Sequence, residues 1–131
     1  MPASNYVRTN TLAAWLQRQS VTFPTTLYVA LFSTNPTAAN SGTEVSGGDY
    51  ARAAVNFSSP VISGDSAVIQ NTGEVTFPQL TASAGTAAYI GIMDARTGGN
   101  LLFFQPLPTS LDLDIGYTPY FSAGELKVYL T

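Results

Sequence analysis

The stretch that decides the fold covers residues 87–105, AAYIGIMDARTGGNLLFFQ. It holds two apolar runs, Ala87–Asp94 and Leu101–Gln105, on either side of the turn sequence Thr97–Asn100. Paired glycines between two apolar runs are typical of a β-hairpin, because the tight turns that join antiparallel strands need positive φ. This stretch therefore predicts an antiparallel pair at the centre of the chain.

Further short β segments lie on both sides of the hairpin. Residues 27–32, LYVALF, form an apolar run between Pro24 and Pro36, which predicts a central strand covered on both faces. Residues 111–115 alternate apolar and acidic side chains, as a strand with one solvated face does. The other predicted strands are Ala51–Phe57, Ala67–Gln70, Glu74–Phe77 and Leu126–Leu130, and Gly64-Asp65 marks a turn.

One helix is predicted, over Asn5–Gln19, with Ser4 or Asn5 as its N-terminal cap. Leu12, Trp15 and Leu16 fall at the i, i+3, i+4 spacing of an apolar helix face. We expect Trp15 to fix this helix on a sheet as part of the core. The alternative is that Trp15 docks into a partner.

Seven or eight short strands without intervening helices exclude parallel βαβ architecture. The predicted fold is a mainly β, antiparallel sandwich with jelly-roll or Greek-key connections, preceded by one helix. Residues 1–131 are expected to form a single domain, with the helix at about 5–19 and strands from about 27 to 130.

The composition restricts the possible chemistry. The chain has no histidine, no cysteine and 13 charged residues in 131. This composition disfavours zinc sites, Ser-His-Asp triads and thiol catalysis, which need those side chains. The five basic residues are scattered, so no direct contact with nucleic acid is expected, and no stretch is long enough to predict a membrane span.

The acidic residues offer few candidates for a catalytic or metal site. Asp112 and Asp114 share one face of a predicted strand, where paired carboxylates could serve glycoside hydrolysis or calcium binding, but alternate acids usually mark the solvent side. Glu44 and Asp49 flank Gly47-Gly48 and are the better candidates for a loop cation site. The expectation is nevertheless no enzyme, no cofactor and no metal. The tyrosines, numerous for this length, could serve the core, subunit contacts or a ligand.

Several strings resemble a family of small virion proteins of tailed bacteriophages. They are residues 26–36, TLYVALFSTNP; 42–52, GTEVSGGDYAR; 89–95, YIGIMDA; 98–103, GGNLLF; and 123–130, AGELKVYL. Members of this family are often labelled tail-fibre proteins, and similar small β-proteins act as capsid cement or decoration subunits. The resemblance implies a structural role in the virion, after assembly in the bacterial host cytoplasm, and brings no catalytic residues with it.

The loop over residues 33–50 is the candidate contact region, because a loop of this length in a compact domain is often functional. Within and just after it, Glu44, Asp49, Tyr50 and Arg52 are the predicted partner-contact residues. Arg52 could pair with Glu44 or Asp49 and fix the loop, or it could reach a neighbouring subunit.

The function predicted first is a non-enzymatic capsid cement protein, a homo-oligomer and preferably a trimer, bound to the major capsid protein. The alternative is a tail-fibre or baseplate adaptor or receptor-binding module. A carboxylate-based glycosidase is a remote third possibility.

Overall fold

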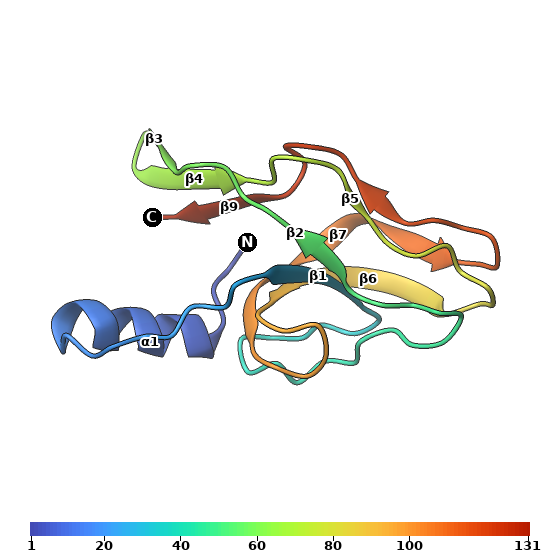
Figure 1. Ribbon diagram of the computed structural model, residues 1–131, viewed down its shortest axis with the longest axis horizontal. Coiled ribbons are helices and arrows are strands. Elements are labelled where there is room, and N and C mark those ends of the chain that lie inside the picture. The colour runs from blue at the N-terminus through green and yellow to red at the C-terminus, as the bar shows by residue number, and fades with distance from the viewer.

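The computed structural model describes residues 1–131 as one helix and nine strands (Figure 1). In chain order the elements are α1 Asn5–Leu16, β1 Leu27–Phe32, β2 Ala53–Val55, β3 Val61–Ser63, β4 Ser66–Gln70, β5 Val75–Thr76, β6 Gly85–Met93, β7 Leu101–Leu113, β8 Tyr120–Phe121 and β9 Lys127–Leu130.

The largest sheet has four antiparallel strands in the order β2-β1-β6-β7. Its centre is the predicted hairpin: β6 pairs with β7 around Gly98 and Gly99, both of which have positive φ. The strand β1 has the predicted bounds and lies between β2 and β6, with its residues 29–32 buried. The apolar run of β1 is thus explained by cover on both of its faces.

The strand β7 is longer than the sequence indicated. Leu101–Gln105 and the alternating segment at 111–113 belong to one strand of 13 residues that includes Pro106 and Pro108. Proline is tolerated here because β7 lies at the edge of its sheet, and its outer side is paired only at the isolated bridge between Ala3 and Phe103. The pairing with β6 shifts register between Ala87 and Tyr89, which accommodates the irregular middle of β7.

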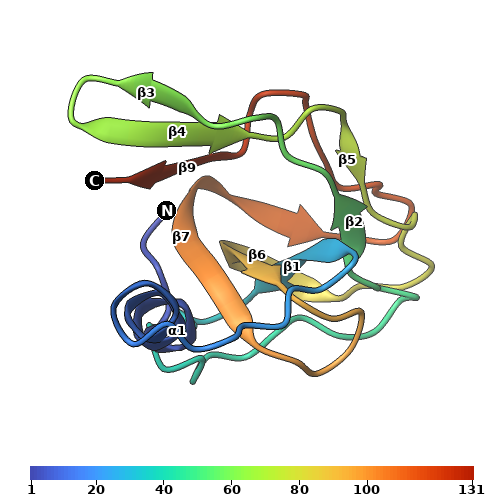
Figure 2. The ribbon, with the colours of Figure 1, turned by 60° about the vertical axis from the view of Figure 1, so that its left-hand side comes forward.

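Two smaller antiparallel sheets, β3-β4-β9 and β5-β8, complete the fold. Figure 2 shows β3, β4 and β9 as a layer beside β7, with β5 next to β2. The core lies on the face of the large sheet that carries Val29, Leu31 and Ile90, and it includes Phe77 and Phe121. The mainly β class with antiparallel sheets and one N-terminal helix is confirmed, whereas β3 and β8 were not predicted.

The helix α1 forms where it was predicted, and Ser4 caps it: the Ser4 side chain accepts a hydrogen bond from the Val7 N–H at 3.2 Å. It ends at Leu16 rather than at position 19, because Arg18 adopts a positive φ of 55° that a helix cannot continue through. The first turn is attached to the body, since the Ser4 N–H donates to the Leu102 carbonyl of β7 at 2.8 Å.

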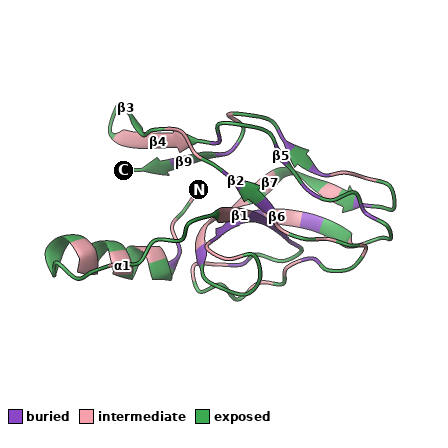
Figure 3. Cartoon of the chain, in the orientation of Figure 1, coloured by how far each residue is buried: buried purple, intermediate pink, exposed green.

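The expectation that Trp15 belongs to the core is wrong. Its side chain is 80% exposed, and α1 contains no buried residue (Figure 3). The helix leaves the body beyond its first turns, and β7 is the element against which it packs. An i, i+3, i+4 stripe shows which helix face is apolar, but it does not show that a covering surface lies in the same chain.

Candidate functional site

The loop at residues 33–50 is held in a defined shape along the end of β1. Glu44 forms a bridge with Phe32, and the Val45 N–H donates to the Leu31 carbonyl at 3.0 Å. Gly48 has a φ of +60°, and a Cβ at this position would collide with the carbonyl of Ala82. The close approach of two backbones explains why a glycine is needed in the second half of the loop.

Arg52 lies at the centre of a polar cluster that we call the Arg52 cluster, formed with Glu44 and Tyr50. Its Nε donates to Glu44 Oε2 at 3.0 Å, and its Nη2 donates to Glu44 Oε1 at 2.8 Å. Its Nη1 donates to the carbonyls of Ala95 and Gly98, both at 2.8 Å. Arg52 therefore ties the loop to the turn of the β6–β7 hairpin, and its pairing partner inside the chain is Glu44 rather than Asp49.

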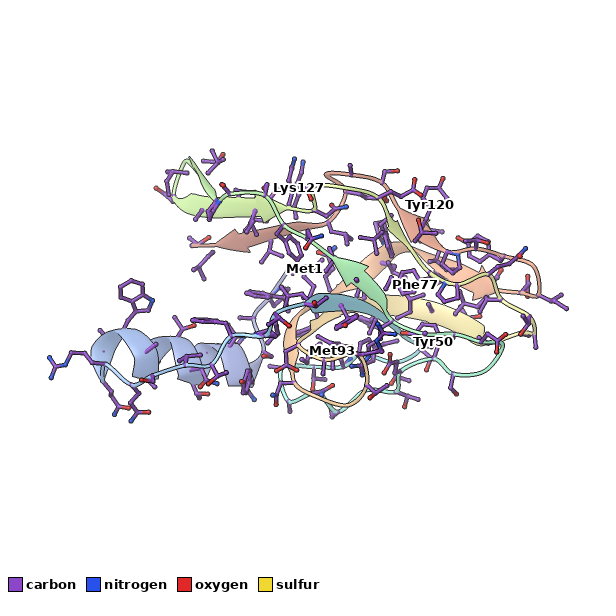
Figure 4. The ribbon with its side chains drawn as sticks, in the orientation of Figure 1. Met1, Tyr50, Phe77, Met93, Tyr120 and Lys127 are labelled. Carbon is purple, nitrogen blue, oxygen red and sulfur yellow. The ribbon has the colours of Figure 1, made fainter.

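Tyr50 completes this cluster from the interior side. Its hydroxyl accepts a hydrogen bond from the Leu31 N–H at 3.0 Å and donates one to Glu44 Oε2 at 2.7 Å. Its ring stacks on Phe77 with centroids 6.2 Å apart, and both rings lie inside the fold in Figure 4. Burial raises the pKa of Tyr50 above its ordinary value, and the Glu44 carboxylate raises it further. The Glu44 hydrogen bonds likewise raise the pKa of Arg52, against the effect of partial burial.

Asp49 lies apart from this cluster. Its backbone has a φ of 65°, and its Oδ2 accepts a hydrogen bond from the Thr81 hydroxyl at 3.1 Å. The structure thus brings Glu44, Tyr50 and Arg52 together and leaves Asp49 at another contact of the same loop. Their hydrogen bonds hold the loop in place, while their contact with a partner stays a prediction.

The remaining acidic candidates are exposed. Asp112 is on β7, where its Oδ1 is 3.4 Å from the Thr86 hydroxyl, and Asp114 follows the strand. No group of three or more aspartate, glutamate, histidine or cysteine side chains comes together in a way that could hold a metal ion. None of the helices is long and apolar enough to span a membrane.

A surface of large apolar side chains occurs on α1 and the segment after it. We call it the helix patch: Leu12, Trp15, Leu16 and Phe23. Trp15, Leu16 and Phe23 are each more than three-quarters exposed. The stripe on the predicted helix was the sequence signal for three of these residues, although we expected it to be covered.

A second apolar surface is a groove between the β3-β4-β9 sheet and the end of the large sheet. It has a volume of about 260 Å³, and no charged side chain lines it. We call it the apolar groove, and its lining residues are Leu27, Phe57, Pro60, Ala67, Val68, Ile69, Ile92, Leu102, Phe103, Val128 and Leu130. Sequence reasoning missed it, because its walls come from segments as distant as 27 and 130.

The structure is thus a small antiparallel β fold with a projecting helix, an exposed apolar patch on that helix and a separate apolar groove. The family model of the Podophage GP4 fiber I protein gp80 matches residues 2–129. The chain belongs to this family of phage fibre proteins. None of the curated proteins matches it.

This finding confirms the resemblance to phage virion structural proteins. It also bears on which part of the virion such a protein belongs to. The matched family is described as a fibre, so it supports the tail-fibre alternative better than the capsid cement role that was predicted first.

Proposed function

We propose that this chain is a non-enzymatic structural subunit of a phage tail fibre, built into the fibre through its exposed apolar surfaces. Membership of a phage fibre family supports a role in the tail. The observation that carries the assembly role is the helix patch, which presents Trp15 and Phe23 to solvent at about 80% exposure. Exposed apolar patches rimmed by polar residues mark sites of protein interaction.

The low charge of the chain supports the same function. Charged residues are depleted at the centre of protein interfaces, where burial would strip their water. Arg8 and Arg18 flank the helix patch in the sequence, and Asp94, which accepts hydrogen bonds from Asn100, lines the cleft beside Trp15 and Phe23; the apolar groove has no charged side chain. Both surfaces can therefore be covered by another chain without burying an unpaired charge.

The loop at 33–50 is the second proposed contact region of the subunit. Because Arg52 and Tyr50 are bonded inside the chain, their part is to hold the loop in one conformation. A loop held in advance loses less conformational entropy when it meets a partner. The exposed residues of the loop, Asp49 among them, would make the contact itself.

Virions that lack this protein test the proposal. We expect such particles to package DNA and to release it on heating at the same temperature as the wild type, while adsorption to host cells falls. In purified wild-type virions the chain should be present in far fewer copies than the major capsid protein. Restoring the chain from a plasmid should restore adsorption.

A different set of results would contradict the tail-fibre proposal. Near-equal stoichiometry with the capsid protein, together with early DNA release and normal adsorption in its absence, would return the assignment to a capsid cement protein.

A further inference from the structure

The helix patch and the apolar groove are complementary surfaces that one chain presents at the same time. The patch is a projecting set of side chains with an indole and a phenyl ring, and the groove is an uncharged hollow of about 260 Å³. We propose that the helix patch of one copy docks into the apolar groove of a second copy, and that this contact assembles the subunit into a closed homo-oligomer. This inference rests on the proposed function, because it names the chain that covers the exposed surfaces.

The helix cannot cover the groove of its own chain. Its first turn is bonded on two sides, by the Ser4 N–H to the Leu102 carbonyl and by the Asn5 N–H to the Ala38 carbonyl, at 2.8 and 2.9 Å. The direction of α1 is therefore fixed at its base. Figures 1 and 2 show it running away from the body and separate from the β3-β4-β9 layer.

The two surfaces are nevertheless continuous. Leu102 and Phe103 of β7 line the apolar groove on one side, and they also line a cleft of about 280 Å³ between α1 and the segment that holds Phe23. An occupant can thus extend from the groove across β7 to the helix. A second copy would fit both features, since it offers a helix for the groove and a groove for the helix.

The area that one such contact buries is that of a weak contact. Burying Trp15 and Phe23 removes about 240–400 Å² of surface, from the usual area of an aromatic side chain and their exposure of about 80%. With Leu12, Leu16 and the groove walls, one contact buries at most about 800 Å² in total, which is below the roughly 1,200 Å² of a stable specific interface, so a single contact is weak. A closed ring repeats the contact in every subunit, which stabilises it beyond a single pair.

This type of contact is compatible with closure. A contact between two different surfaces generates either a closed ring or an open filament. The trimer expected from the sequence would be one such ring, and a two-fold dimer with reciprocal contacts would be another.

The test uses the purified full chain and two charge substitutions at exposed positions. Trp15→Glu alters the helix patch, and Leu130→Glu alters the rim of the groove, where Leu130 is 62% exposed. The matched control is Ile115→Glu, because Ile115 is equally apolar, 73% exposed and outside both surfaces. Molar mass by light scattering is measured over a range of concentrations.

We expect the wild type and Ile115→Glu to form the same closed oligomer, a dimer or a trimer. The association constant of Trp15→Glu and that of Leu130→Glu should each be lower than that of the wild type by about 30-fold or more, as when a central residue of an interface is lost. Trp15 is the only tryptophan, so its emission should shift to shorter wavelength as the wild type assembles.

Mixing the two weakened variants identifies which surfaces meet. In a 1:1 mixture the intact helix of the Leu130→Glu chain can dock into the intact groove of the Trp15→Glu chain. We expect a heterodimer from two chains that are each monomeric alone. Failure of this complementation while the wild type still assembles would overturn the helix-to-groove contact in favour of helix-to-helix pairing.

Other results would also overturn the inference. A wild-type chain that is monomeric at its highest soluble concentration would do so, as would an open polymer. If that monomer is still required for adsorption, the tail-fibre function stands and the helix patch binds another tail protein; if it is dispensable for adsorption, the proposed function fails as well.

Discussion

Glu44 holds Arg52 through both carboxylate oxygens, at 3.0 Å from Oε2 to Nε and 2.8 Å from Oε1 to Nη2. Only 8% of the Arg52 side chain is exposed. The third guanidinium nitrogen is used by two backbone carbonyls of the hairpin turn, so the whole planar group is engaged. This geometry connects the loop at 33–50 to β6 and β7, and it depends on the fork shape of arginine.

Arg52→Lys should therefore destabilise the chain although it keeps the charge. A lysine ammonium cannot satisfy both carboxylate oxygens and both carbonyls, and it leaves partly buried acceptors without a donor. We expect a loss of about 1–3 kcal/mol in the free energy of unfolding, measured by urea denaturation. Arg8→Lys, at an exposed helix position, is the control and should change stability by less than about 0.5 kcal/mol. Equal stabilities of Arg52→Lys and wild type would show that the bidentate geometry contributes nothing.

Tyr50 predicts a decline of stability in alkaline solution. In the unfolded chain the tyrosine loses its proton around the ordinary pKa of 10.0, whereas burial raises its pKa in the folded chain. Above pH 10 the folded state therefore binds more protons than the unfolded state, so stability falls as the pH rises. The Tyr50 contribution is full below pH 10 and is lost above it, with a slope of up to about 1.4 kcal/mol per pH unit.

The comparison with Tyr50→Phe isolates this contribution from that of the other titrating groups. The variant should be less stable at pH 8, because the Leu31 N–H loses its acceptor, and its stability should fall less steeply above pH 10. Parallel curves for the two proteins above pH 10 would contradict the buried, protonated state of Tyr50.

Local patterns predicted most of the strands but missed β3 and β8. The run at 27–32 and the Gly98-Gly99 hairpin carry their information within a few residues, and both form as predicted. The missed strand β8 is only two residues long and is fixed by distant pairing, Phe121 with Val75 and Tyr120 with Thr76. Such pairing leaves little periodicity in the sequence for a prediction to use.

The candidate site residues likewise differ in how much local sequence signal they carry. The sequence places Glu44, Asp49 and Arg52 around a glycine-rich loop and predicts that Arg52 pairs with one of the two acids or reaches a neighbouring subunit; the structure selects Glu44. The apolar groove had no such signal, since its walls lie up to a hundred residues apart. The helix stripe was visible, but its exposure was not, because local periodicity does not specify which chain covers an apolar face.

Substitution of Asn71 should lower the free energy of unfolding more than substitution of most other polar residues. Its side chain is 1% exposed; Nδ2 donates to the carbonyls of Gly73 and Ser122, and Oδ1 accepts from the Leu126 N–H at 2.9 Å. Asn71→Leu leaves three backbone groups without partners, at about 1–3 kcal/mol for each buried one. We expect a loss of at least about 3 kcal/mol, measured by thermal or urea unfolding.

Asn71→Asp distinguishes the donor role from the acceptor role. A carboxylate can still accept from Leu126, but it cannot donate to the two carbonyls. It should lose stability as well, and more so at neutral pH than in acid, where the protonated group regains one donor. If Asn71→Asp is as stable as the wild type at pH 7, the two donated hydrogen bonds contribute little.

Trp15→Ala should leave the stability of the isolated subunit nearly unchanged, in contrast to what the helix pattern first suggested. A buried indole that is truncated to alanine typically costs about 3–5 kcal/mol, but an exposed side chain away from special contacts changes stability by less than about 0.5 kcal/mol. The matched substitution is Phe77→Ala, which removes a ring from the centre of the core and should cost about 3–5 kcal/mol. Both are measured by urea denaturation at a concentration low enough to keep the chain monomeric.

At high concentration the melting temperature of the wild type should rise as copies associate, because binding to the folded state adds to its stability. Trp15→Ala should lose most of that concentration dependence while its low-concentration midpoint stays the same. A large loss at low concentration would mean that Trp15 packs against its own chain after all.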